Sequence, residues 1–120
     1  MTIVLERGTM IYHIVSKTDW AAVGASDYYR GDTLDTEGFI HCSTLEQVAG
    51  TANLFFRGRE DLLLLKINPE KLKSPLNYEV AGDGRLFPHI YGPLEVEAVV
   101  ALADFPPNLD GSFDLPEKYR

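Results

Sequence analysis

The chain has 120 residues, of which 45% are hydrophobic and 24% are charged. This mixture is typical of one globular domain that is long enough to bury a core without disulfide staples. Its 18 acidic and 11 basic residues give a net charge of -7, which argues against a broad nucleic-acid surface or an anionic-membrane surface. A small anionic ligand held by a few local donors stays compatible with this charge.

Targeting signals are not evident in the sequence. No run approaches the roughly 20 apolar residues that a membrane span needs, and no secretory signal pattern opens the chain. The single cysteine, Cys42, cannot form an intramolecular disulfide, which fits a reducing compartment. We therefore expect a cytoplasmic protein without a membrane partner. Met10 is a second candidate for the native start, with the residues before it as an upstream extension.

The first part of the chain predicts a strand, a helix and a long loop. Residues 10–15 are apolar and extended in pattern, which favours a strand. Residues 16–24 predict a helix with Thr18 as its N-cap and Gly24 as its stop. Residues 25–36 are rich in turn formers and predict a loop or an interrupted helix. Loops of this length often border functional sites.

The stretch 37–43, Glu-Gly-Phe-Ile-His-Cys-Ser, combines a glycine corner, a strand and the start of a helix. Strand alternation places Phe39, His41 and Ser43 on one face. Ser43 precedes Thr-Leu-Glu, a capping-box pattern in which Glu46 reaches back to the helix start. A polar pair delivered to a helix N-terminus is a natural place for an anion or a reacting group.

The second half begins with the clearest element of the chain. Apolar residues recur with a helical period over 44–56, which predicts a buried stripe that includes Val48 and Phe55. Residues 61–67 form a continuous apolar run, which predicts a strand buried on both faces at the centre of a sheet. The remaining predictions are a helical turn over 68–72, a strand over 76–80, a turn at 82–84, an extended segment over 87–94, a strand over 96–105 and an irregular tail over 106–120.

The chain has three histidines, each in a predicted strand or at its edge. His13 is flanked on its face by two aliphatic residues, so a structural imidazole and a ligand-binding one stay equally open. His41 shares its face with polar Ser43 beside a helix start, which favours a functional role. His89 shares a strand face with Tyr91 in the same way.

Glu79 and Arg85 bracket the predicted glycine turn just ahead of the third histidine. A carboxylate there can orient a ribose hydroxyl or stabilise a cation, and a guanidinium can hold a phosphate. A solvated turn with a surface ion pair is the alternative. No glycine-rich phosphate loop of the Rossmann or Walker type occurs in the sequence.

These motifs resemble a known family. The matching segments are Tyr12-His13, the 37–43 stretch, Glu46-Gln47 and Phe-Pro-His-Ile-Tyr-Gly-Pro-Leu over 87–94. They resemble a family of small bacterial domains of unknown function that is grouped with the ADP-ribosyltransferase-like (PARP-like) fold. The resemblance covers one domain over residues 10–105, with 1–9 as an N-terminal extension and 106–120 as a C-terminal tail. The order of elements is also similar to that of RNA 2'-phosphotransferases.

The fold that we expect is α+β and ADP-ribosyltransferase-like: a split, mostly antiparallel β core of about six strands with one long packed helix. The resemblance implies that His13 matches a first-strand histidine that holds the nicotinamide ribose or amide. It implies that His41 and Ser43 build the second wall of a cleft. The candidate catalytic residues are then His41, His89 and Glu79, and the candidate ligand contacts are His13, Ser43, Tyr29, Arg85 and Tyr91.

The predicted function is binding of NAD or a related ADP-ribosyl or nucleotide ligand, with ADP-ribosyl transfer or hydrolysis as the accompanying chemistry. NAD enters as a substrate, and no other cofactor and no metal is assigned. Three alternatives stay open. They are a non-catalytic nucleotide-binding module, an RNA 2'-phosphotransferase-like enzyme, and a metal site made by the three histidines with Glu79.

Overall fold

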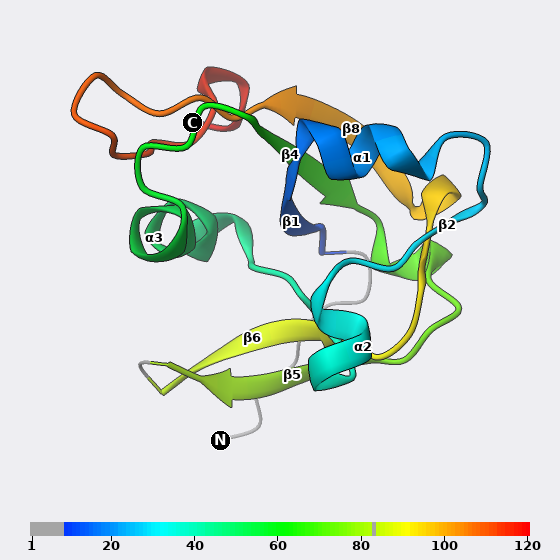
Figure 1. Ribbon diagram of the computed structural model, residues 1–120. Helices are drawn as coiled ribbons and strands as arrows, with labels where there is room; N and C mark the ends of the chain where they lie inside the picture. Colours follow the sequence, from blue (N-terminus) through cyan, green and yellow to red (C-terminus); the bar gives the residue numbers. More distant parts are fainter. Residues whose placement is uncertain (1–8, 83) are drawn as a thin grey trace.

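The computed structural model describes residues 9–82 and 84–120 (Figure 1). Residues 1–8 of the predicted extension and Asp83 of the predicted turn lie outside the described residues. Within the described chain, no helix has the length and apolar character that a membrane crossing requires.

Short helices and strands alternate along the described chain. The strands are β1 Ile11–Ser16, β2 Tyr28–Tyr29, β3 Ile40–His41, β4 Leu62–Ile67, β5 Leu76–Ala81, β6 Arg85–Ile90, β7 Leu94–Glu95 and β8 Val99–Asp104. The α-helices are α1 Lys17–Val23, α2 Thr33–Glu37 and α3 Leu45–Phe55, and 3-10 turns occupy Pro69–Lys71, Val96–Ala98 and Glu117–Tyr119.

Three antiparallel sheets form the β core, in the orders β1-β4-β8, β2-β7 and β3-β6-β5. In Figure 1, β1, β4 and β8 lie in one half of the molecule and the β5–β6 hairpin lies in the other, with α3 to one side. The predicted α+β class with a split antiparallel core and one longest helix is therefore confirmed. The strands are more numerous than expected because β2 and β7 form a small sheet of their own. Several are shorter because the 39–43 strand keeps Ile40–His41 as its ladder and 96–105 opens with a 3-10 turn.

The prediction of a central, doubly buried strand over 61–67 is confirmed by β4. It pairs with β1 on one side and β8 on the other, and Leu64 and Leu65 are both fully buried although their side chains point to opposite faces. A strand with a sheet neighbour on each edge and a core on each face needs the continuous apolar run that the sequence has here.

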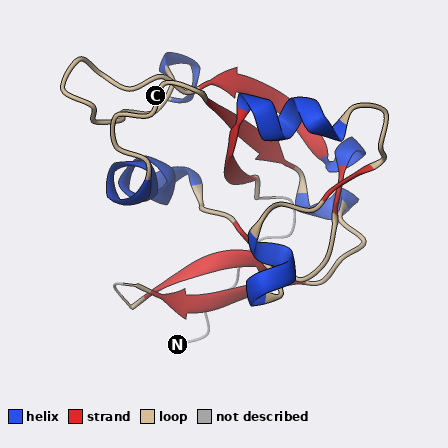
Figure 2. Cartoon of the chain, in the orientation of Figure 1, coloured by secondary structure: helices blue, strands red, loops and turns tan. Residues whose placement is uncertain are grey.

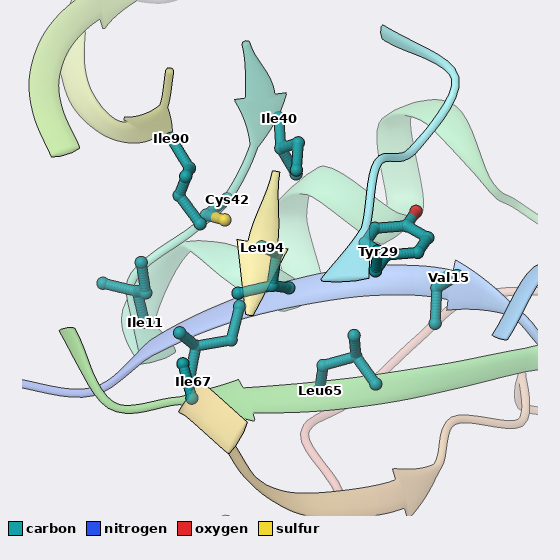
Figure 3. Packing of buried hydrophobic residues seen from close by; sticks show 10 residues of the cluster. Ile11, Val15, Tyr29, Ile40, Cys42, Leu65, Ile67, Ile90 and Leu94 are labelled. Carbon is teal, nitrogen blue, oxygen red and sulfur yellow. The ribbon is translucent and has the colours of Figure 1, made fainter. Parts of the chain in front are cut away.

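Strand β1 separates two hydrophobic clusters. Ile11 and Val15 point into the first cluster, whereas Tyr12 and Ile14 point into the second, as expected from strand alternation. The first cluster (Figure 3) contains Ile11, Val15, Tyr29, Ile40, Cys42, Leu65, Ile67, Ile90, Leu94 and Ala98. The second contains Tyr12, Ile14, Val48, Ala52, Leu62, Leu64, Phe105 and Phe113. The first cluster joins the β1 sheet to β3 and β6, and the second joins it to α3 and the tail.

The start and the capping residues of helix α3 differ from those expected. Its capping box uses Thr44 and Gln47, with the Thr44 amide donating to Gln47 Oε1 at 3.0 Å, whereas Ser43 and Glu46 were expected. The helix starts one residue later because the Ser43 backbone still pairs with Tyr12.

The apolar stripe of α3 is buried only in part. Val48 is fully buried as predicted, but Phe55 is 71% exposed, so its assignment to the core was wrong. The cap residue Phe56 packs against the second cluster in its place.

The remaining differences are local. Helix α1 uses Ser16 instead of Thr18 as its N-cap, and Ser16 Oγ accepts from the Asp19 amide at 3.0 Å. The predicted loop over 25–36 contains β2 and most of α2. The tail is irregular up to its final 3-10 turn, as Figure 2 shows, and Phe113 anchors it at 2% exposure.

Candidate functional site

The short β3–β6 ladder brings two histidines together. His41 and His89 are direct cross-strand partners, so their side chains leave the same face of the sheet. The imidazole centroids are 5.3 Å apart with a 73° angle between the ring planes. On the opposite face, Ile40 and Ile90 are buried in the first cluster, which fixes the register because a one-residue slip would bury the histidines instead.

Glu79 approaches the pair from strand β5. Its Oε1 atom accepts a hydrogen bond from the Tyr91 hydroxyl at 2.5 Å and lies 2.9 Å from His89 Nδ1. Hydrogen bonding to Tyr91, and then to His89, holds the pKa of the Glu79 carboxyl below its ordinary value. An ionised carboxylate can only accept, so His89 Nδ1 carries the hydrogen. The carboxylate thereby fixes the tautomer of His89.

The second nitrogen of His89 is a buried atom without a partner. The His89 side chain is 6% exposed, and no described residue forms a hydrogen bond with its Nε2. Phe39 covers the ring in a stacked arrangement, with centroids 4.1 Å apart and planes 20° apart. Thr33 Oγ1 in α2 donates to the Phe39 carbonyl oxygen at 2.7 Å, which holds this cover in place.

The accessible edge of the cluster is made of polar groups. The His41 side chain is 48% exposed, and its Nε2 lies 3.0 Å from Glu37 Oε2. Glu79 also reaches solvent, with 40% of its side chain exposed. We use "His–Glu cluster" for the six residues Glu37, Phe39, His41, Glu79, His89 and Tyr91.

The structure places His13 and Tyr29 on the other side of the β3 backbone. His13 Nδ1 lies 2.6 Å from the His41 carbonyl oxygen, and His13 Nε2 lies 2.9 Å from the Tyr29 hydroxyl. Burial is the main cause that lowers the pKa of His13, so the ring is held in its neutral form. These two residues contact each other, but they reach the His–Glu cluster only through backbone.

Two further candidates lie apart from the cluster. Ser43 is buried at 4% exposure, and its Oγ faces Thr51 Oγ1 at 3.2 Å on α3, so it does not share the surface of His41. The chain turns there from the β3 ladder to the bridge with Tyr12. Arg85 starts β6, and its Cα lies about 13 Å along the strand from that of His89.

Sequence reasoning missed Glu37 and Phe39 as members of the site. The signal was present, because Glu37, Phe39 and His41 alternate along the chain. Gly38 lies between them in the left-handed region at φ 87°, which ends α2 and sends the chain into β3. The described residues offer no group of three or more His, Cys, Asp or Glu side chains suited to a metal ion. The three histidines therefore do not form the metal site that was one alternative.

The sequence of this antiparallel α+β domain matches a known family. Residues 14–102 match the model of "Protein of unknown function (DUF952)", and the chain belongs to this family. A search of curated proteins gave no match.

Solved structures of one relative match almost the whole chain. The crystal structure of protein CC0527 from Caulobacter crescentus is 37% identical, with a TM-score of 0.84 over 92% of this chain and 98% of that one. The solution NMR structure of CC0527 is 39% identical, with a TM-score of 0.78 over 92% of this chain and 96% of that one.

Proposed function

We propose that the His–Glu cluster binds a ribose-containing nucleotide of the NAD or ADP-ribose class, in a domain of the ADP-ribosyltransferase-like type. The observation that carries the proposal is the shared carboxylate oxygen of Glu79, which both His89 and Tyr91 hold in place. The resemblance of the motifs around His41 and His89 to that fold adds support.

The chemistry of the cluster suits the parts of such a ligand. A fixed, ionised carboxylate accepts hydrogen bonds from the hydroxyls of a ribose, as acidic residues do in dinucleotide sites. Phe39 and Tyr91, whose ring centroids are 5.3 Å apart, offer aromatic faces to a base or a nicotinamide ring. The half-exposed His41 offers a hydrogen bond to a hydroxyl or a phosphate.

The same groups fit cleavage at the ribose C1' atom. The bond from C1' to nicotinamide breaks, and nicotinamide leaves with the bonding electron pair. The Glu79 carboxylate stabilises the positive charge that develops on the ribose. Water or an acceptor hydroxyl then adds to C1', and its proton passes to His89 Nε2. That nitrogen is buried, so this step requires the side chains around it to open a path for the proton.

The accessible edge favours this ligand over RNA. Glu37 and Glu79 both reach solvent beside His41, and two carboxylates repel the many phosphates of an RNA chain more than the single pyrophosphate of NAD or ADP-ribose. A ribose or a cationic ring gains from the same charges. We therefore prefer the NAD or ADP-ribose class to an RNA 2'-phosphotransferase activity.

The test measures binding and turnover on the same protein samples. Titration calorimetry with NAD and with ADP-ribose gives affinity, and release of nicotinamide from NAD gives turnover. Glu79→Gln should weaken ADP-ribose binding about tenfold or more, because a charged hydrogen-bond acceptor is lost. Glu97→Gln removes the same charge from an exposed carboxylate on the Val96–Ala98 turn and serves as the control.

Each outcome has a defined meaning. Nicotinamide release that falls in Glu79→Gln far more than affinity falls supports catalysis, because charge on the transition state is then being stabilised. Binding without release for every acceptor tried supports a non-catalytic nucleotide-binding module. No binding of either nucleotide to the wild type would overturn the proposal.

A further inference from the structure

A surface pocket of about 410 Å³ is lined by residues of α1, of β2 and of the segment that joins β2 to α2. Figure 1 shows where these elements lie in the fold. Its volume falls in the range of about 300 to 1,000 Å³ that is usual for small-ligand pockets. Asp19, Tyr28, Tyr29, Gly31 and Asp32 are among the residues that line it, and no member of the His–Glu cluster does. The pocket is therefore separate from the nucleotide site proposed above.

Tyr29 is the buried polar group of this pocket, at 7% exposure. The His41 carbonyl oxygen can only accept, so His13 Nδ1 carries the hydrogen of their 2.6 Å contact. His13 is neutral, so its Nε2 accepts, and the Tyr29 hydroxyl must donate its only hydrogen to it. The Tyr29 oxygen thus keeps only lone pairs for a ligand.

Gly31 leaves that oxygen open. In Figure 3 the hydroxyl of Tyr29 lies on the side away from Leu65 and Ile67, at the edge of the first cluster. A Cβ atom on Gly31 would stand 3.3 Å from the Tyr29 oxygen, and its φ of 70° is one that other residues rarely adopt. A larger residue would crowd the hydroxyl as well as strain the chain.

The charges around the pocket are negative. Burial raises the pKa of Tyr29, and the carboxylates of Asp32 and Asp19 raise it further, so both carboxylates act on this hydroxyl. Asp32 makes no side-chain cap to α2 although it occupies the N-cap position. Arg30, which also lines the pocket, is paired with Asp35 at 2.8 Å, so its charge is already matched.

We propose that this pocket binds a compact organic cation with N–H donors, of the guanidinium or ammonium class. The Tyr29 oxygen and the carboxylates of Asp19 and Asp32 accept the N–H groups. Tyr28, which is 48% exposed, provides an aromatic wall against which a cation or its alkyl stem packs. The same chemistry is available from a free amine or from an arginine or lysine side chain of a protein.

The test compares a cation with its neutral isostere. The two ligands are used as their Nα-acetyl derivatives, called arginine amide and citrulline amide below, because acetylation removes the charge of the α-amino group. They have nearly the same shape, and only the arginine compound carries a charge. NMR titration of backbone amides over residues 28–32 should show saturable binding of arginine amide, with citrulline amide at least about tenfold weaker. A glycine-arginine-glycine peptide, run in parallel, separates a protein side chain from a free small molecule. Saturable binding of either arginine form supports the pocket.

Matched variants locate the effect. Asp32→Asn should weaken arginine binding about threefold to tenfold, because these carboxylates are solvent-exposed and each contributes modestly. Asp27→Asn removes the same charge from an exposed residue just before β2 that is not among the lining residues, and it should leave binding unchanged. The test needs no nucleotide, so its result is independent of the function proposed above.

Three results would overturn the inference. Citrulline amide could bind as tightly as arginine amide, which would exclude charge recognition. Asp27→Asn could weaken binding as much as Asp32→Asn, which would indicate a general attraction to an acidic protein. Third, the amide signals of residues 28–32 could stay unchanged with both arginine compounds, which would show that the pocket does not bind the cation.

Discussion

His41 and His89 are direct partners across the β3–β6 ladder, and each imidazole has its own glutamate: Glu37 for the first and Glu79 for the second. The two rings nevertheless differ in environment. The His41 side chain is 48% exposed, whereas that of His89 is 6% exposed beneath Phe39. The imidazole of His41 is therefore open to solvent, whereas that of His89 is enclosed by the protein.

Tyr91→Phe should raise the pKa of Glu79 towards its ordinary value. The Tyr91 hydroxyl is the first cause of the lowered pKa, and phenylalanine cannot donate to the carboxylate. NMR titration of the Glu79 carboxyl carbon measures this change directly. Tyr28→Phe, which removes an exposed hydroxyl far from β5, is the control and should leave the titration of Glu79 as it is in the wild type.

The same contact gives stability a defined dependence on pH. A carboxyl whose pKa is lowered by folding stabilises the fold above its unfolded pKa of about 4.3, and this contribution is lost as the pH falls through the folded pKa. Tyr91→Phe should reduce the part of the unfolding free energy that Glu79 contributes above this pH range and that is lost in acid. If the unfolding free energy of the variant falls in acid as steeply as that of the wild type, the hydrogen bond does not contribute to stability.

His13 should make the fold less stable in mild acid. Its folded pKa is lowered, so below about pH 6.5 the unfolded chain takes up a proton that the folded chain does not, and stability falls with falling pH. Urea unfolding from about pH 7.5 to about pH 5 measures the slope. His13→Gln should reduce the slope of unfolding free energy against pH. His41→Gln changes a half-exposed ring and should leave the fall in stability that is due to His13.

Two substitutions in α3 should behave very differently. Val48→Ala empties space in the fully buried second cluster and should cost about 1 to 3 kcal/mol of unfolding free energy. Phe55→Ala alters a side chain that is 71% exposed and should change stability by about 0.5 kcal/mol or less. Denaturant midpoints of both variants give the comparison. Equal losses would mean that the last turn of the helix is packed in solution.

Cys42 should be inert in the folded protein. Burial raises the pKa of its thiol, and the side chain is only 4% exposed in the first cluster. A chromogenic disulfide reagent should react at a rate set by unfolding, and rapidly once denaturant is added. Fast labelling of the native protein would show that the first cluster opens around this residue.

The sequence allowed much of this arrangement to be predicted. Alternation alone places His41 with Phe39, and the glycine turn at 82–84 was predicted between the strand that carries Glu79 and the segment that carries His89. The presence of a capping box could be predicted, but its residues could not: Ser43 and Glu46 were expected, and Thr44 and Gln47 form it. These features depend on residues that are close in the chain.

The features that escaped prediction depend on distant residues. The bond between Tyr29 and His13 joins positions separated by α1, and no local pattern encodes it. Periodicity placed both Phe55 and Phe56 on the apolar stripe, but only Phe56 packs against the second cluster, and the exposure of Phe55 depends on how the helix meets the rest of the fold. Ser43 follows the strand pattern of 37–43, yet its backbone pairs with Tyr12 instead of continuing the β3 ladder.

Strand β1 contributes side chains to both hydrophobic clusters, and this affects how the domain unfolds. Side chains of one strand fill both hydrophobic clusters, so the two clusters cannot come apart one at a time, and amides of β1 and β4 should exchange with deuterium only through cooperative global unfolding. Among the described residues, the β5–β6 hairpin has the two residues of β3 as its further ladder partner. Ile90 ties β6 to the first cluster, so exchange through local opening is expected for the edge strand β5, which carries Glu79.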